Sequence, residues 1–221
     1  MNDAVTNSAS YRNVVAGATV AAIAAAWAVR RVSLRWGAVD EELEMALPGD
    51  DFLPAPDLQA TRAITINAPS SHVWPWVAQL GQNRGGFYTY DWLENLAGCD
   101  IHTSDVIVPE LRIRAVGDKV RLAPSVALGV VALEEGHHVV LRGAVAPDGT
   151  SAPAPYDFTW AFVLTDATPG VTRLIVRERF VYLAGWARML AEPVEMVSFL
   201  MSQRMLRGIR ERAERHTAAG V

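Results

Sequence analysis

Two long alternating segments in the C-terminal third of the chain constrain its fold most strongly. Residues 156–165 place five large side chains on one face: Tyr156, Phe158, Trp160, Phe162 and Leu164. Residues 171–182 alternate likewise, with Leu174, Val176, Glu178, Phe180 and Tyr182 on one face and Arg173, Arg177 and Arg179 on the other. The turn sequence Thr168-Pro169-Gly170 separates the two segments. A period of two predicts strands, so we expect an antiparallel hairpin whose aromatic face covers another large element.

A helix is predicted from Ala187 to about Thr217. Apolar residues recur there at three- and four-residue steps: Leu190, Val194, Val197, Met201, Met205 and Ile209. This spacing is typical of one apolar helix face. Pro193 weakens the first turns, so the regular helix is expected to begin near it.

Shorter elements are predicted upstream. Residues 61–67 alternate as a first strand, with Ile64 and Ile66 on one face. A helix follows from Ser70 or Ser71 to about Leu80, and a second short helix spans about 90–97. Residues 115–144 contain turn signals between short apolar runs and are predicted to form strands. The chain is therefore expected to be α+β.

Residues 81–105, which follow the first short helix and include the second, combine aromatic and ionisable side chains around Gly85-Gly86. Large apolar faces with a few polar groups are typical of the wall of a small-molecule pocket. Tyr88, Tyr90 and Trp92 are the aromatic candidates. The alternative is an aromatic core with a solvated acidic face.

The strings ATRAITINAPSSHVWPWVAQL, GQNRGGFYTYDWLEN and VGDKVRL, together with this order of elements, resemble the START-like or helix-grip superfamily. This superfamily is also called SRPBCC and includes polyketide cyclases/dehydrases and lipid-transport proteins. Within it, the strings resemble a bacterial membrane-associated subgroup. The resemblance covers residues 61–217 and implies a curved antiparallel sheet that wraps around the long C-terminal helix. No established catalytic role carries over.

The resemblance also implies a cavity between the sheet and the helix. The residues expected to line it are Tyr88, Tyr90, Trp92, Phe158, Trp160, Phe162, Val176, Glu178, Phe180, Val197 and Met201. The alternative is that the same aromatic side chains simply fill a core.

Glu178 is the sharpest single candidate, because the alternation places this carboxylate on the apolar face. There it needs a partner, for which Arg142 is a candidate, or a raised pKa. It is either a general base or ligand-binding group, or a rim residue that reaches water. His102 and Asp91 are weaker acid or base candidates. The spacing of Asp100 and His102 fits no known zinc pattern, so we expect no metal, and no cofactor motif is present.

Residues 13–29 carry no charge and are followed by Arg30, Arg31 and Arg35. A helix of this length spans about 25 Å, slightly less than the roughly 30 Å of a bilayer core. A single membrane anchor is favoured over a cleaved signal peptide or a soluble helix. The arginines on its C-terminal side predict a cytoplasmic domain.

The expected organisation is a tail and candidate transmembrane helix at 1–36, an acidic Pro-containing linker at 37–60, the helix-grip domain at 61–217 and a disordered tail at 218–221. Phe52 and Leu53 could alternatively fold back and cap the domain. The net charge of −4 argues against a nucleic-acid partner.

Three functions remain open. The first is a membrane-tethered, non-catalytic binding domain for a hydrophobic small molecule or lipid. The second is a cyclase- or dehydratase-like enzyme that uses acid or base residues in the cavity. The third is a structural or interaction protein whose cavity is filled.

Overall fold

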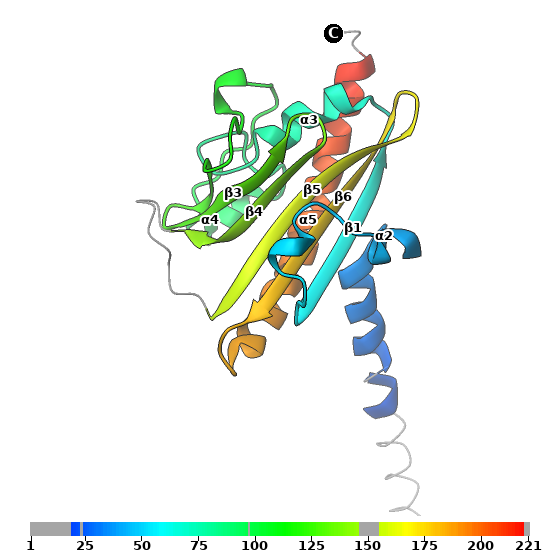
Figure 1. Cartoon of the computed structure of the whole chain (residues 1–221), viewed down its shortest axis with the longest axis vertical. Helices are drawn as coiled ribbons and strands as arrows, with labels where there is room; N and C mark the ends of the chain where they lie inside the picture. Colours follow the sequence, from blue (N-terminus) through cyan, green and yellow to red (C-terminus); the bar gives the residue numbers. More distant parts are fainter. Residues whose placement is uncertain (1–18, 23, 97, 146–154, 219–221) are drawn as a thin grey trace, which may run out of the picture. The chain divides into compact units, whose positions relative to one another are not determined.

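The computed structural model describes residues 19–22, 24–96, 98–145 and 155–218 (Figure 1). The chain divides after Leu34 into two compact units. In the first unit the described residues are helical. The elements of the second unit are α2 (Asp40–Glu44), the 3-10 helix η1 (Asp50–Phe52), β1 (Leu58–Ile66), α3 (Ser70–Ala78), α4 (Asp91–Leu96), the 3-10 helix η2 (Pro109–Leu111), β2 (Lys119–Ala123), β3 (Val126–Glu134), β4 (His138–Val145), β5 (Tyr156–Thr168), β6 (Val171–Tyr182) and α5 (Ala187–Ala218).

The first unit bears on the predicted membrane helix. That prediction covers residues 13–29, of which 13–18 and 23 lie outside the described residues. In the part of the chain that the structure describes, no helix is both long enough and apolar enough to cross a bilayer. Within this unit the guanidinium of Arg31 lies 5.4 Å from the ring of Trp27.

The six strands form one antiparallel sheet in the order β1-β6-β5-β4-β3-β2. The β5–β6 hairpin is its longest pairing and runs from Tyr156 opposite Tyr182 to Thr168 opposite Val171. The hairpin predicted from the alternation is therefore confirmed. Because β1 pairs with β6, the first and last strands of the chain lie side by side, next to the long helix that follows.

α3 and α5 pack on one face of the sheet, which we call the inner face; Figure 1 shows α5 behind the sheet. The main core lies between them and includes Ile64, Ile66, Phe162, Leu174, Val176, Leu206 and Ile209. The α+β prediction, with an antiparallel sheet, two short helices after the first strand and a long C-terminal helix, is confirmed at this level.

The opposite, outer face is covered by the acidic segment that begins at Arg35. α2 and η1 belong to this segment, which includes most of the acidic linker expected at residues 37–60. Three arginines of β6 hold it: Arg173 pairs with Glu42 at 2.7 Å, and Arg177 and Arg179 pair with Asp50 at 2.5 and 2.7 Å. The alternative that Phe52 and Leu53 fold back describes the structure better.

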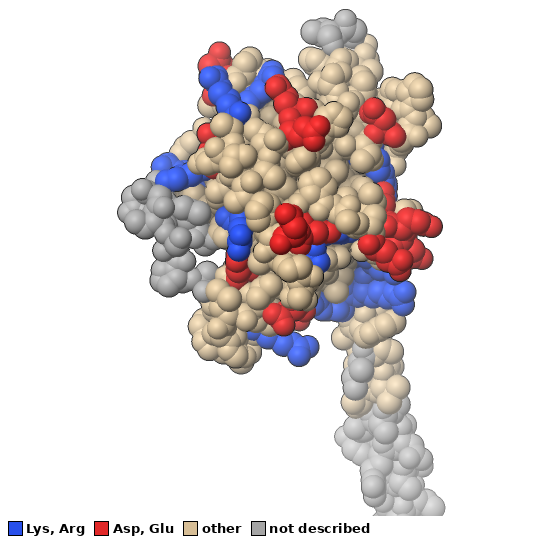
Figure 2. All heavy atoms as spheres, in the orientation of Figure 1, with Lys and Arg blue, Asp and Glu red and all other residues tan. Residues whose placement is uncertain are grey.

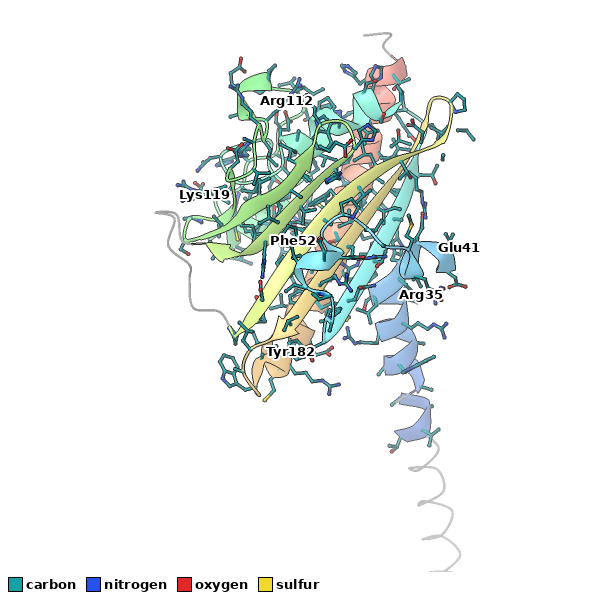
Figure 3. All side chains as sticks on the ribbon, viewed as in Figure 1. Arg35, Glu41, Phe52, Arg112, Lys119 and Tyr182 are labelled. Atoms are coloured by element: carbon teal, nitrogen blue, oxygen red, sulfur yellow. The ribbon has the colours of Figure 1, made fainter. Side chains whose placement is uncertain are left out.

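Figure 3 shows Phe52 on this outer face. The guanidinium carbon of Arg142 lies 5.7 Å from the centre of the Phe52 ring. Leu53 is buried. A small second core forms beneath the segment from Leu47, Ala63, Val163 and Ile175. In the view of Figure 2, acidic and basic side chains are interspersed over the molecule.

The orientation of α5 corrects one prediction. Its N-terminal half buries Ala187, Ala191 and Glu195, whereas Leu190, Val194 and Val197 of the predicted apolar stripe are exposed. The stripe is correct only further along, at Met205 and Ile209. The physical reason is that small inward side chains let the helix lie close to the strands, and a polar group occupies the next inward position.

Candidate functional site

The candidate site lies on the inner face of the β5–β6 hairpin. Three cross-strand pairs stand there in succession: Phe158 opposite Phe180, Trp160 opposite Glu178, and Phe162 opposite Val176. Directly opposed residues of an antiparallel pair have Cβ atoms about 4.5–5.5 Å apart. Six of the residues predicted to line a cavity therefore share one continuous surface.

Burial changes along this surface. Phe162, Val176 and Phe180 are buried, whereas Phe158 and Trp160 are only partly buried and pack at the margin of the main core. The rings are in contact: the centroids of Phe158 and Phe180 are 4.6 Å apart, and those of Trp160 and Phe162 are 4.8 Å apart. Phe87, from the loop after α3, lies 6.2 Å from Trp160. The aromatic wall is thus partly accessible.

Glu178 is buried within this wall, with 1% of its side chain exposed. One oxygen, Oε1, accepts hydrogen bonds from Ser198 at 2.6 Å and Ser202 at 3.3 Å, and it lies 3.2 Å from Nη1 of Arg62. The other oxygen, Oε2, is buried and has no hydrogen-bond partner among the described residues. The reading of Glu178 as a rim residue that reaches water is therefore wrong.

Arg62 connects Glu178 to the helix. Its Nη2 lies 2.5 Å from Oε1 of Glu195 on α5, and its guanidinium carbon lies 5.6 Å from the ring of Phe199. Both Arg62 and Glu195 are fully buried. Buried charges need partners of opposite charge and hydrogen bonds, and these side chains supply them to one another across the interface between β1, β6 and α5.

The predicted partner of Glu178, Arg142, is on the other side of the sheet. It stands opposite Thr159, whereas Leu141 stands opposite Trp160, so Arg142 points to the outer face. There it pairs with Asp157 at 2.8 Å. The strand register explains this correction, because a shift of one residue moves a side chain to the opposite face.

Sequence reasoning missed Arg62, Glu195, Ser198 and Ser202. A signal for Arg62 was present, since it alternates in phase with Ile64 and Ile66 and so shares the inner face. Glu195 follows Ala187 and Ala191 at four-residue steps, which is the inward face of α5. The large apolar residues beside these positions suggested a different inward face, so this spacing was not recognised.

The aromatic segment 81–105 is mainly a packing scaffold. Tyr88 is buried, and its hydroxyl donates a hydrogen bond to the carbonyl oxygen of Trp76 at 3.0 Å. Burial raises the pKa of Tyr88, so the hydroxyl remains protonated. The ring of Tyr88 lies edge-on to Trp76 and beneath the guanidinium of Arg212, 4.8 Å from the ring centre. The segment thereby fixes α3 against α5.

The remaining predicted residues of this segment lie at the surface. Tyr90 is partly exposed, and Trp92 is 69% exposed. Asp91 accepts hydrogen bonds from the backbone N–H and the hydroxyl of Thr103, at 2.8 and 2.6 Å. His102 is exposed and lies 3.3 Å from Asp100. Asp91 and His102 therefore make contacts within their own loop, apart from the Glu178 network.

On α5, Val197 is 59% exposed and Met201 is partly buried. Their place in a ligand site stays a prediction.

Within the described residues, no three His, Cys, Asp or Glu side chains are grouped so as to hold a metal ion. Burial raises the pKa of the Cys99 thiol, which disfavours the reactive thiolate.

A separate cleft of about 230 Å³ opens beside α3. Arg112, labelled in Figure 3, comes from the 3-10 turn beside it. The lining residues are Trp74, Pro109, Arg112, Ile113, Arg114, Leu133 and Glu135. None of them belongs to the predicted site.

No protein-family model matches the chain, and no curated protein matches its sequence. Solved structures with a similar arrangement include the Zhui aromatase/cyclase from Streptomyces sp. R1128, with 14% identity, a TM-score of 0.45 and coverage of 74% of this chain and 98% of that one. Protein Ms6760 from Mycobacterium smegmatis has 17% identity and a TM-score of 0.43, over 70% and 89% of the two chains. CalU16 from Micromonospora echinospora has 14% identity and a TM-score of 0.34, over 72% and 86%.

Proposed function

We propose that this protein binds a hydrophobic small molecule or lipid on the inner face of its sheet, beneath the N-terminal half of α5. The observation that carries the proposal is the change in burial along β5. Phe162 is completely buried in the core, whereas Phe158 and Trp160 on the same face are only partly buried. Partly buried aromatic faces beside a few fixed polar groups are typical of ligand sites.

The neighbouring helix supports this reading. α5 presents Ala187 and Ala191 inward, and both are fully buried. Small side chains at these positions let α5 lie close to the strands, and the helix adds little apolar bulk of its own beside the hairpin. Glu178, Arg62 and Glu195 supply the fixed polar groups beside this aromatic surface.

Binding without catalysis is the better-supported function. Glu178 is a buried carboxylate with a free oxygen, which also suits a general base in a cyclase- or dehydratase-like reaction. However, Asp91 and His102, the other acid and base candidates, are engaged or exposed in a separate loop. Glu178 therefore lacks a second proton-transferring partner from the predicted set.

The direct test is extraction of the purified full chain, followed by mass spectrometry of the small molecules released. We expect a hydrophobic compound that is depleted in a Trp160→Phe preparation, which keeps an aromatic ring but changes its size and polarity. An Arg114→Ala preparation, altered in the separate cleft, serves as the control. Absence of any released compound, together with no saturable binding of apolar probes, would contradict the proposal.

The proposal includes a membrane tether formed by residues 1–36, with the folded domain on the cytoplasmic side. Its support is the uncharged run at 13–29 followed by Arg30, Arg31 and Arg35. Cell fractionation tests the tether, and a C-terminal reporter that is active only in the cytoplasm tests the orientation. Full-length protein found in the soluble fraction would remove the tether and leave the binding proposal intact.

A further inference from the structure

Two buried polar atoms on the inner face have no hydrogen-bond partner among the described residues, and they belong to cross-strand neighbours. One is Oε2 of Glu178, and the other is Nε1 of Trp160. The two residues are directly paired in the β5–β6 register. A buried polar atom without a partner costs on the order of 1–3 kcal/mol. Two such atoms on directly paired residues are therefore candidates for hydrogen bonds to one shared partner.

The chemistry of the two atoms is complementary. The carboxylate oxygen only accepts hydrogen bonds, and the indole N–H only donates one. A hydroxyl group is the smallest substituent that satisfies both, because its oxygen accepts from Trp160 while its hydrogen is donated to Glu178.

Glu178 is held so that Oε2 remains available. Ser198 and Ser202 both donate to Oε1, and Arg62 also approaches that oxygen. All three contacts therefore fix the carboxylate through one oxygen and leave the other for a different partner. The Arg62–Glu195 pair anchors this arrangement to α5.

The surroundings are apolar on both sides. The pair Phe158–Phe180 precedes Trp160–Glu178 along the hairpin, and the pair Phe162–Val176 follows it. Phe87 adds a further ring near Trp160. A ligand that reaches this point must therefore be mostly apolar, and aromatic rings suit the walls.

We propose that Glu178 and Trp160 form a hydroxyl-recognition site, and that the ligand is an apolar molecule bearing a neutral hydroxyl group, as in a phenol or a long-chain alcohol. This inference rests on the proposed function and narrows its ligand class. Carboxylic acids are disfavoured, because their ionised form places a second negative charge beside Glu178. Pure hydrocarbons are disfavoured, because they leave both polar atoms without partners.

The test is calorimetric titration of the full chain with four matched ligands: 2-naphthol, naphthalene, 2-methoxynaphthalene and 2-naphthoate. Hydrogen bonds to a charged group favour 2-naphthol over naphthalene by about tenfold or more. The methyl ether can accept from Trp160 but cannot donate to Glu178, so it is expected to lose that advantage. The naphthoate is expected to bind at least about tenfold more weakly than 2-naphthol.

Two variants locate the effect. Glu178→Gln replaces the acceptor that faces the ligand with an amide of nearly the same shape, and it should reduce the preference for 2-naphthol to about threefold or less. Trp160→Phe removes only the donor and should reduce the preference partially, while naphthalene still binds. If Glu178→Gln fails to fold, Trp160→Phe and the four-ligand series on the unaltered chain still decide the question.

The outcomes separate this inference from the function on which it rests. Equal affinities of the unaltered chain for 2-naphthol and naphthalene would overturn the hydroxyl-recognition site, while apolar binding would stand. Tightest binding of the naphthoate would overturn the site in the same way. Failure of all four ligands to bind would overturn the proposed function and the inference together.

Discussion

Arg62 on β1 and Glu195 on α5 form a fully buried ion pair, with Nη2 of the arginine 2.5 Å from Oε1 of the glutamate. They are 133 residues apart in the sequence. This contact joins the first strand of the sheet to the last helix of the chain. It also places a fixed positive charge beside Glu178.

Removing the arginine should therefore strongly destabilise the fold. Arg62→Met leaves the carboxylates of Glu178 and Glu195 buried without this cation, and loss of one partner of a buried pair costs about 3–5 kcal/mol. Urea unfolding of the full chain measures the loss. The control is Arg142→Met, which breaks a pair whose arginine side chain is 38% exposed and should cost less than about 1 kcal/mol. Equal losses for the two variants would contradict a buried, tightly coupled network.

At Gly208 in α5, substitution by alanine should lower stability, although the same substitution usually stabilises a helix. Glycine in a helix is normally less stable than alanine by about 1 kcal/mol. Here a Cβ at position 208 would lie 2.6 Å from the carbonyl oxygen of Tyr88 and 2.7 Å from its Cβ. We expect Gly208→Ala to destabilise the protein by about 1–3 kcal/mol, because Tyr88 must move away from α5.

The matched control is Gly185→Ala, where a Cβ would meet no atom within 4 Å. That substitution should leave the melting temperature unchanged or raise it slightly, since it restricts the unfolded chain. A rise in melting temperature for Gly208→Ala would show that α5 does not approach Tyr88 as closely as described.

The acidic segment on the outer face should come loose at low pH. Burial alone raises the pKa of Glu42, but hydrogen bonds from Arg173 and from the backbone N–H of Val39 outweigh it and hold the pKa below its ordinary value. A lowered folded pKa means that the contribution of Glu42 to stability is complete above the unfolded pKa. This contribution is lost as the pH falls through the folded value.

The measurement is the free energy of unfolding of the unaltered chain and of Glu42→Gln at about pH 7 and about pH 3. We expect the unaltered chain to be more stable at the higher pH and the difference between the two to shrink at the lower pH. A difference that is constant with pH would show that the charge of Glu42 does not stabilise the segment.

Features set by residues close together in the sequence could be predicted, whereas contacts between residues far apart in the sequence could not. The β5–β6 hairpin could be predicted, because period-two alternation is visible within twelve residues and determines which side chains share a face. The network around Glu178 could not be assembled, because its members come from β1, β6 and α5, far apart in sequence. Alternation placed Glu178 correctly on the inner face, but it gave no information about which distant cation reaches it.

The predicted stripe on α5 was wrong in its first half for a different reason. Hydrophobic periodicity selects large apolar residues, such as Leu190 and Val194, as the buried face. Close packing against a sheet selects small ones, and Ala187 and Ala191 occupy the buried positions. The same preference for apolar partners hid Glu195, whose buried carboxylate pairs with Arg62.

The two halves of α5 can be compared directly by truncating one residue in each. Ile209 is fully buried in the main core, so Ile209→Ala should cost about 2–5 kcal/mol. Val197, although part of the predicted stripe, is 59% exposed, so Val197→Ala should change stability by no more than about 0.5 kcal/mol. Alanine is also the better helix former, which favours a small gain at position 197. Urea titration of both variants in the full chain gives the comparison. A loss at Val197 as large as that at Ile209 would mean that the exposed face of the N-terminal half of α5 is covered in solution.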